Sequence, residues 1–394
     1  MGIRHPINFP YHGIVNVVGN VYNRNIGWPF VKFLSPSGRR DSEDAKPAVD
    51  FVRVEKEGSP IRLEDIARES GVSIKTVSRA IHDHPDVSSA TKSRVMKIVD
   101  KHNYSPNWAA QSLRSQKTHT VGFVVPNITN GYFGEIGMTM DRLFRSHRYA
   151  TLISFTSNDH QIEIESLNSL INKNVDGIVF APIGGAGDYF RKVPLLARKP
   201  LVIIDNAFKE MDAACVLHDN AHGAGLLVEH LYRHGHRRIA CVTGPTEETS
   251  GAERLEGYRT ALARLGLPYD ESLVRVTNWE INGGDEAIRD LFGNRAQRPT
   301  AVFFANSQQL LGGYKAFNSL GLSLPSDVAV VSFDPPNVMD SLVPRPTTLE
   351  AFEEKIGSAA ARCLLELIQG KKGARKRAMR IRGDVRVGTS CGCA

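Results

Sequence analysis

Between residues 120 and about 390, short apolar runs alternate with segments in which apolar residues recur every three or four positions. The runs predict buried strands, and the periodic segments predict amphipathic helices packed against them. The expected strands are Thr120–Val125, Thr151–Phe155, Gly177–Pro182, Leu201–Ile204, Ile239–Thr243, 272–277, Ala301–Phe304 and Val328–Phe333. The expected helices are 134–147, 159–173, 220–234, 251–265, 283–293 and 308–320. Strands that are apolar throughout are typical of parallel sheets covered on both faces, so two such series predict two doubly wound α/β subdomains.

Residues 61–105 show only the helical period. Gly71 can end a first helix in a left-handed conformation, and Ser73 and Ser88 can cap the two helices that follow. The inward positions are Leu63, Ile66 and Ala67 in the first helix, Val77 and Ile81 in the second, and Val95, Ile98 and Val99 in the third. Two short helices across a glycine turn predict a helix-turn-helix within an all-α N-terminal domain.

The second helix presents polar side chains to the outside. A recognition helix reads base edges in the major groove with residues near its N-terminus, and Arg can form two hydrogen bonds to guanine. The expected DNA-contacting residues of this helix are Ser73, Ile74, Lys75, Thr76, Ser78 and Arg79. The alternative is a small helical bundle whose charges are merely solvated.

The remaining segments suggest where the domains begin and end. Residues 1–60 are rich in turn residues and predict a disordered extension, a start-site artefact or, less favoured, a small extra domain. Residues 106–119 form a short basic linker between the helical domain at 61–105 and an effector-binding and dimerisation domain at 120–390. The N-terminus has no clean secretion signal and the chain has no long apolar run, so we expect no membrane partner and a cytoplasmic, nucleoid-associated protein.

Charge and cysteine content narrow the picture further. The formal net charge is +7, and residues 61–118 hold ten Lys or Arg against six Asp or Glu, which suits a polyanion partner. The five cysteines, Cys215, Cys241, Cys363, Cys391 and Cys393, are odd in number and lack framework spacing. The pair Cys391-Gly-Cys393 lacks the usual two-residue spacing and visible partner ligands, so we expect a reduced tail, no metal site and no cofactor.

Several motifs resemble the lactose-repressor (LacI/GalR) family, over about four-fifths of the chain. The resemblance is strongest in Asp65-Ile-Ala-x-x-Ser-Gly-Val-Ser-x-x-Thr-Val-Ser-Arg79 and in Asn103-Tyr-Ser-Pro-Asn107. Ala109–Arg114 follows the second motif, and further matches downstream are Gly235–Ile239, Arg254–Tyr258, Leu324–Val331 and Pro346–Thr348. Arg62 departs from the family, which usually has a capping Thr at that position.

The resemblance implies a homodimeric repressor that binds double-stranded operator DNA and changes its affinity when a small-molecule effector binds. It also implies that residues 107–115 form a hinge helix in the minor groove, where Asn107, Ala110 and Leu113 contact DNA and Leu113 is a wedge between base pairs. The C-terminal domain is then similar to periplasmic binding proteins.

The effector site implied by the resemblance lies where the predicted strands end, the usual ligand position in open α/β sheets. By position, the ligand-facing residues are Tyr132, Phe133, Asp159, Arg254, Trp279, Asn306 and Asp334. Aromatic faces and hydroxyl-binding polar groups suit a carbohydrate. Ser307 and Pro335 replace residues that are often Asp in the family, so the ligand can differ from common hexoses.

Other classes fit less well. An enzyme is disfavoured because Gly184–Gly187 lacks the spacing of a phosphate loop and no nucleophile elbow occurs. A periplasmic solute-binding protein would need a signal peptide and no helix-turn-helix. A regulator that activates transcription, or that depends on a protein co-regulator, stays open, as do the operator, the effector and the choice between dimer and tetramer.

Overall fold

The computed structural model describes residues 61–104, 117–127, 130–184, 192–207, 213–294, 298–350, 352–371, 373 and 378–393. The chain divides into two compact units, Met1–Tyr104 and Ser105–Ala394. The hinge positions Asn107, Ala110 and Leu113 lie outside the described residues, as does the N-terminal extension.

The first unit is a three-helix domain, as predicted. Its helices are α1 (Leu63–Ser70), α2 (Ile74–Ile81) and α3 (Ser89–Lys101). Gly71 ends α1 with a φ of 67°, a left-handed conformation that costs glycine little. Ser73 and Ser88 cap α2 and α3 by accepting hydrogen bonds from the amides of Thr76 and Thr91. The shared core is Ile66, Ala67, Val77, Ala80, Val95 and Val99.

The start of α1 is capped in an unusual way. The Arg62 side chain makes no capping hydrogen bond, but the backbone N–H of Arg62 donates to Oδ2 of Asp65 at 3.0 Å. Asp65 thereby supplies one half of a capping box, and the acceptor that a Ser or Thr at position 62 would offer to the helix amides is missing.

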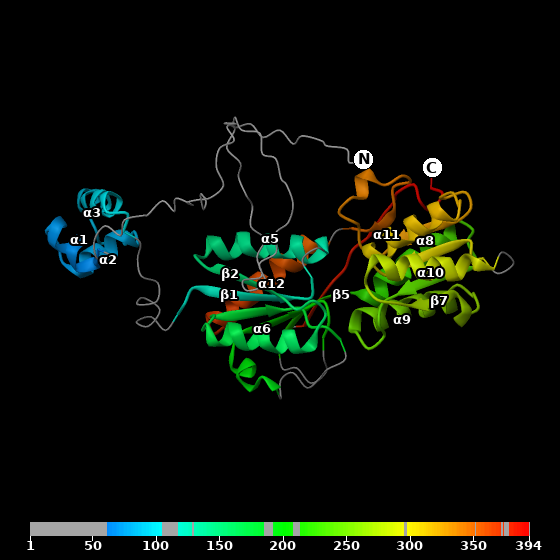
Figure 1. Ribbon diagram of the computed structural model, residues 1–394, viewed down its shortest axis with the longest axis horizontal. Coiled ribbons are helices and arrows are strands. Elements are labelled where there is room, and N and C mark those ends of the chain that lie inside the picture. Colours follow the sequence, from blue (N-terminus) through cyan, green and yellow to red (C-terminus); the bar gives the residue numbers. More distant parts are fainter. Residues whose placement is uncertain are drawn as a thin grey trace, which may run out of the picture. The chain divides into compact units, whose positions relative to one another are not determined.

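The second unit contains two sheets with helices on both faces (Figure 1). The strands of the first sheet are β1 (Thr120–Val125), β2 (Ala150–Phe155), β3 (Gly177–Phe180), β4 (Leu201–Ile204), β5 (Ala214–His218) and β11 (Ala378–Ile381), in the order β11-β5-β4-β3-β1-β2. Every pair in it is parallel. Helices α5 (Gly131–Ser146) and α12 (Glu353–Ile368) lie on one face, and α6 (His160–Asn172) lies on the other.

The second sheet has the order β12-β10-β9-β8-β6-β7. Its strands are β6 (Ile239–Thr243), β7 (Val274–Val276), β8 (Ala301–Phe304), β9 (Ala329–Ser332), β10 (Thr347–Leu349) and β12 (Val385–Arg386). Its helices are α8 (Asn220–Arg233), α9 (Thr249–Arg264), α10 (Ile281–Gly293) and α11 (Ser307–Ser319). Short 3₁₀ turns cover Pro194–Arg198, Glu271–Leu273 and Met339–Ser341.

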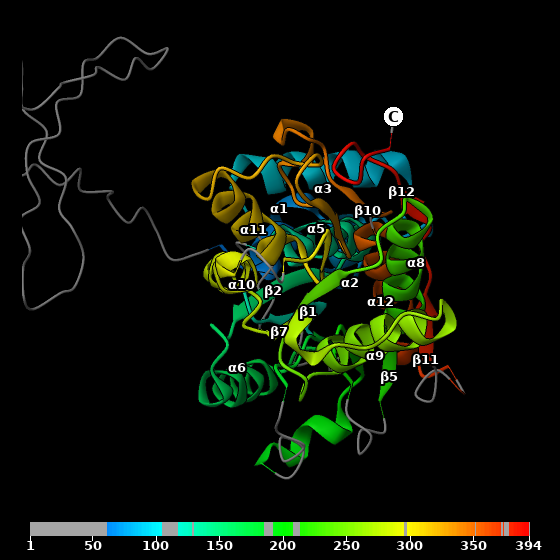
Figure 2. The ribbon, with the colours of Figure 1, turned by 90° about the vertical axis from the view of Figure 1, so that its right-hand side faces the viewer.

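Alternate residues of the strands β6, β8 and β9 in the second sheet enter different cores. Cys241, Phe303 and Val331 pack with residues of α8 and α9. Their neighbours, among them Val302 and Phe304, pack with α10 and α11, which lie side by side in both ribbon views (Figure 2). Burial of both faces explains why these strands are apolar throughout, and it confirms the doubly wound fold.

The chain crosses between the two sheets three times, a feature that the sequence did not predict. It crosses from β5 into α8, from β10 into α12, and from β11 into β12. The sequence suggested two consecutive series, but α12 and β11 belong to the first sheet although they follow most of the second. Within the described residues no helix has the length and apolarity needed to span a bilayer.

Candidate functional site

The outward face of α2 is the candidate DNA-reading surface. Val77 and Ala80 are buried, whereas Ser73, Ile74 and Lys75 are exposed. Arg79 lies one turn further on, with Nη1 at 3.5 Å from Oδ2 of Asp86. The pair is exposed, so it contributes little to stability and the guanidinium can exchange Asp86 for another acceptor.

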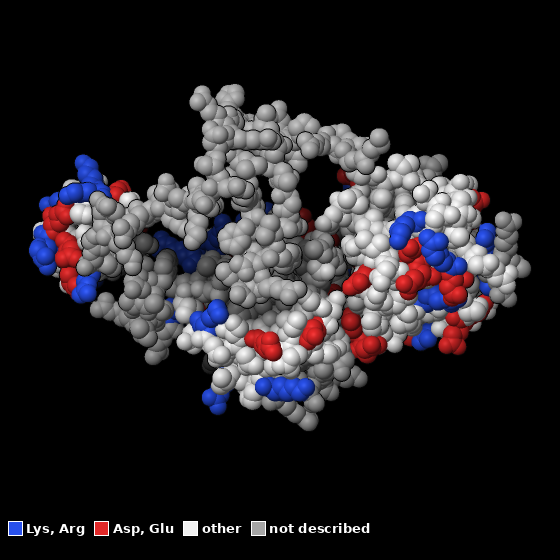
Figure 3. Space-filling model, in the orientation of Figure 1, with Lys and Arg blue, Asp and Glu red and all other residues white. Residues whose placement is uncertain are grey.

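Thr76 and Ser78 are partly buried on the same helix. On the face drawn in Figure 3, lysine and arginine side chains of this unit lie among acidic ones. Lys92 pairs with Asp83, and Lys101 pairs with Glu69. The surface of this unit is therefore not uniformly basic. The segment that we expect to contact DNA is the exposed N-terminal part of α2.

The second unit contains a cavity of about 470 Å³ between its two sheets. This volume lies within the range of small-molecule sites, roughly 300–1,000 Å³. The lining residues are Pro126, Asn127, Asn130, Tyr132, Phe133, Asn158, Ile183, Asp205, Asn206, Glu248, Ser250, Arg254, Trp279, Glu280, Ile281, Asn282, Asn306, Gln308 and Asp334. Residues up to Asn206 come from the first sheet's half and the others from the second.

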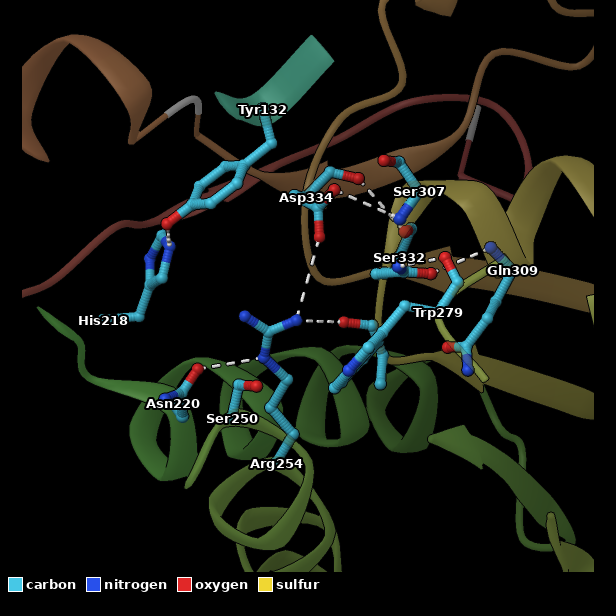
Figure 4. A network of polar contacts seen from close by, with 12 residues as sticks. Tyr132, His218, Asn220, Ser250, Arg254, Trp279, Ser307, Gln309, Ser332 and Asp334 are labelled. Carbon is cyan, nitrogen blue, oxygen red and sulfur yellow. Dashed lines mark hydrogen bonds and ion pairs between the residues drawn. The ribbon is translucent and has the colours of Figure 1, made fainter. Parts of the chain in front are cut away.

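Arg254 is the central cation of the cavity wall (Figure 4). It stands on α9 and is only 5% exposed. Its Nε donates to Oδ1 of Asn220 at 2.9 Å, and Nη1 donates to the carbonyl of Ala305 at 2.5 Å. The guanidinium carbon lies 3.8 Å from the centre of the Phe333 ring. These contacts fix the orientation of the guanidinium.

Asp334 and Asn306 meet at the N-terminus of α11. Asp334 follows β9, and its Oδ2 accepts from the amide of Ser307 at 3.1 Å, while Oδ1 lies 3.9 Å from Nη1 of Arg254. Oδ1 of Asn306 accepts from the amide of Gln309 at 2.8 Å, so Asn306 is the N-cap of α11. A helix N-terminus favours the negative charge of Asp334.

Trp279 connects the aromatic wall to an acidic group. Its indole Nε1 donates to Oε2 of Glu248 at 2.7 Å, and its backbone carbonyl accepts from Nδ2 of Asn306 at 3.1 Å. Arg254 lies over the indole, with 5.5 Å between the guanidinium carbon and the ring centre. The indole is thereby held at its N–H and covered by a guanidinium on one face.

Hydrogen bonds already connect the two walls. Nδ2 of Asn206 donates to Oε2 of Glu248 at 3.3 Å, and Oδ1 of Asn206 accepts from the amide and the hydroxyl of Ser250. Oγ1 of Thr249 donates to the carbonyl of Ala207 at 2.7 Å. Asn206 comes from the first half and residues 248–250 come from the second, so this edge of the cavity is closed by polar contacts.

The opposite part of the wall is aromatic. The hydroxyl of Tyr132 lies 2.8 Å from Nε2 of His218, and the ring of Phe133 packs edge-on against Tyr132. Burial lowers the pKa of His218 well below its usual range, so the imidazole is neutral at pH 7. This wall offers ring faces and a phenol without adding charge.

The cavity is acidic. Burial raises the pKa of Asp205 and of Asp334, and Arg254 opposes both shifts. Burial also raises the pKa of Glu248, against the hydrogen bond from Trp279. With Glu280, four carboxyl groups and one guanidinium line the cavity. Such a site disfavours an additional negative charge and favours neutral groups that donate hydrogen bonds to carboxylates.

The structure brings six of the seven expected effector residues to this cavity: Tyr132, Phe133, Arg254, Trp279, Asn306 and Asp334. Asp159 does not line it. Its carboxylate caps α6, accepting from the amides of Gln161 and Ile162, and the preceding Asn158 lines the cavity in its place. Asp205, Asn206 and Glu248 also line the cavity and were not predicted, although the first two follow β4, where the rule that ligands bind at strand ends points to them.

Two family models match the chain. The model for bacterial regulatory proteins of the lacI family matches residues 62–107, and the model for a periplasmic binding protein-like domain matches residues 228–391. The ribose operon repressor of Escherichia coli is 31% identical over 309 residues, which are 78% of this chain and 92% of that protein. Catabolite control protein A of Priestia megaterium is 29% identical, over 77% of this chain and 91% of that protein.

The solved structures similar to this chain include two that each cover 84% of this chain and 99% of their own. The lac repressor dimer bound to operator and the anti-inducer ONPF has a TM-score of 0.75 at 23% identity, a level that shows the fold. The complex of the transcriptional regulator CelR with cellobiose has a TM-score of 0.64 at 28% identity.

Proposed function

This chain belongs to the lacI family of bacterial regulatory proteins, and from that premise we propose that it is a dimeric repressor whose affinity for operator DNA changes when a neutral, polyhydroxylated ligand binds between the two sheets. It acts on double-stranded DNA in the cytoplasm and releases its ligand unchanged. The observation that carries the proposal is the fixed guanidinium of Arg254 beside Asp334, in a cavity lined by both halves of the unit.

For DNA, we assign base contacts to the exposed part of α2. Lys75 and Arg79 enter the major groove, and Ser73, Ile74, Thr76 and Ser78 contact backbone or base edges beside them. A second copy of the chain binds the other half-site of the operator. Asn107, Ala110 and Leu113 of both copies contact the minor groove between the two half-sites. Arg79 exchanges its exposed pairing with Asp86 for an acceptor on a base.

For the ligand, the excess of carboxyl groups argues for a neutral sugar over a sugar phosphate. A phosphate would bring negative charge next to Asp205, Glu248 and Asp334, with Arg254 as the single cation among the lining residues named above. Sugar hydroxyls can donate to those carboxylates, and the Trp279 indole can stack on the apolar face of a ring. The ribose repressor and CelR–cellobiose relatives support a carbohydrate.

For the coupling, the ligand joins two walls that already share a few hydrogen bonds. A molecule that bonds to Arg254 and Asp334 on one side and to Asp205 on the other stabilises the arrangement in which these groups are close together. A ligand shifts a conformational equilibrium toward the state that it binds more tightly. Stabilising the state in which the two walls are close together would thereby change the affinity of the paired DNA-binding units for the operator.

The test is a thermal-shift screen in which each neutral pentose, hexose or disaccharide is compared with its phosphate ester. A bound ligand raises the unfolding temperature by mass action, so we expect a shift with a neutral sugar and a smaller or absent shift with its ester. The sugar that binds is then added to the protein on its selected operator, where it should change the affinity. Preferential binding of the esters would contradict the assignment of a neutral ligand.

A further inference from the structure

A second cluster of polar side chains lies away from the cavity, at the far end of α8. His230 and His234 are one helical turn apart in the last turn of α8 and at its end, so their rings share one face of the helix. Cys391 and Cys393 come from the C-terminal segment, about 160 positions later, and reach the same place. Gly392 between them has a φ of 81°, which lets both sulfurs turn to the same side.

Cys393 contacts the other three side chains. Sγ of Cys393 lies 3.0 Å from Nε2 of His234 and 3.4 Å from Nε2 of His230, and the two sulfurs are 2.8 Å apart. One ligand atom each from His230, Cys391 and Cys393 falls within 4.8 Å of the others, and His234 adjoins this group through Sγ of Cys393. Cys391 is buried and His234 is exposed, so the cluster sits at the surface with one edge open to solvent.

We propose that His230, His234, Cys391 and Cys393 form a tetrahedral binding site for Zn²⁺ that attaches the C-terminal segment to α8. Two thiolates and two imidazoles are a ligand set that zinc takes in closed, structural sites. Bonds of about 2.0–2.3 Å place ligand atoms of a tetrahedral ion about 3.3–3.8 Å apart. The two nitrogen–sulfur distances are close to that range, and side-chain rotation must open the sulfur–sulfur distance by roughly 1 Å.

A hydrogen-bond donor outside the cluster already faces one of the two sulfurs. The hydroxyl of Thr347 donates to Sγ of Cys391 at 3.0 Å and would continue to do so around a bound ion. On binding, Cys393 and any protonated Cys391 release their protons to solvent, so zinc affinity should rise with pH.

The position in the fold gives the site a structural role. Residues 388–391 are already held beside β9 and β10, since Ser390 donates to the carbonyl of Val330 and accepts from the amide of Thr347. The ion would add a cross-link from this segment to α8. Asn220, which contacts Arg254 of the ligand cavity, is at the other end of α8, about 15 Å along the helix axis from His230. The proposed metal site is therefore separate from the ligand cavity.

The test uses full-length protein, purified with reductant, freed of metal with a chelator and then titrated with Zn²⁺ or Co²⁺. We expect one ion per chain, visible absorption typical of tetrahedral Co²⁺ with thiolate ligands, and an unfolding temperature that rises with Zn²⁺. Cys391→Ser with Cys393→Ser should abolish all three. His234→Ala should weaken binding more than about 100-fold, because even second-shell losses cost 10–100-fold.

Matched variants outside the cluster are Cys215→Ser and His236→Ala, whose side chains contact Ala213 and Thr300 instead. Both should bind metal as the unchanged chain does. If Cys391→Ser with Cys393→Ser fails to fold, His234→Ala decides, since that side chain is exposed. The proposal is overturned if reduced protein binds no ion, if His234→Ala binds it equally well, or if mass spectrometry finds a persistent Cys391–Cys393 disulfide that no reductant converts to a zinc-binding form.

Discussion

Replacing Arg254 by Met removes the charge of the cavity wall while keeping a side chain of similar length. Two hydrogen bonds from a charged donor disappear, those to Asn220 and to the carbonyl of Ala305. Asp334 loses the cation beside it and stays buried, held by the amide of Ser307.

The size of the effect follows from these contacts. Hydrogen bonds to charged groups contribute roughly 1.5–3 kcal/mol each, and removing one partner of a buried ion pair costs about 3–5 kcal/mol. The two figures describe overlapping interactions, so they are not added. The packing of the side chain on Phe333 is largely retained by Met. We expect Arg254→Met to lower the free energy of unfolding by about 3–5 kcal/mol.

The assay is urea unfolding at pH 7, followed by circular dichroism, with Arg259→Met as the control. Arg259 lies on the same helix, is exposed and contacts only the exposed ring and hydroxyl of Tyr269 among the interactions described. Its replacement should cost less than about 1 kcal/mol. Equal, small losses for Arg254→Met and Arg259→Met would refute the view that the guanidinium of Arg254 holds the cavity wall together.

Four further outcomes are expected. Burial raises the pKa of Glu353 from 4.5 to about 7, so between these values the folded state binds more protons than the unfolded state. The free energy of unfolding should therefore fall by about 3 kcal/mol as the pH rises through this range. Glu353→Gln should remove this loss in urea titrations between pH 5 and 8. Asp334→Ala should leave operator binding intact and abolish the response to ligand in gel-shift titrations, and a retained response would count against the assigned site. Arg79→Ala should weaken operator binding by about 1–3 kcal/mol, whereas unchanged affinity would exclude a base contact. Arg62→Thr should stabilise α1 by about 0.5–2 kcal/mol, visible as slower amide exchange in that helix; no change would mean that Asp65 alone caps it sufficiently.

The sequence predicted the elements whose signal is local. The glycine end of α1, the serine caps of α2 and α3 and the apolar strands of both sheets depend on residues close together in the chain, and all are found in the structure. The cavity residues after β8 and β9 were expected from the family resemblance, and their place agrees with the rule that parallel strands all end at one edge of a sheet.

The failures depend on tertiary position. Asn158 and Asp159 are neighbours just beyond the end of β2, and only the path of the chain decides that Asp159 caps α6 while Asn158 reaches the cavity. The side chains of the proposed metal site are likewise distant in sequence: Cys391 and Cys393 lie about 160 positions after His230 and His234, so spacing along the chain does not join them.

The three passages of the chain between its two sheets mean that neither half of the second unit is a continuous stretch of polypeptide. A product shortened after Leu349 would lose α12, which covers the first sheet, and β11, which forms one of its edges, although both lie beyond most of the second sheet in sequence. On the ribosome, the first sheet therefore cannot be completed until nearly the whole chain has been synthesised. We expect that neither limited proteolysis nor expression of gene fragments yields a stable domain containing one sheet alone. Duplication of this unit, or its exchange between genes, would then have to include both sheets.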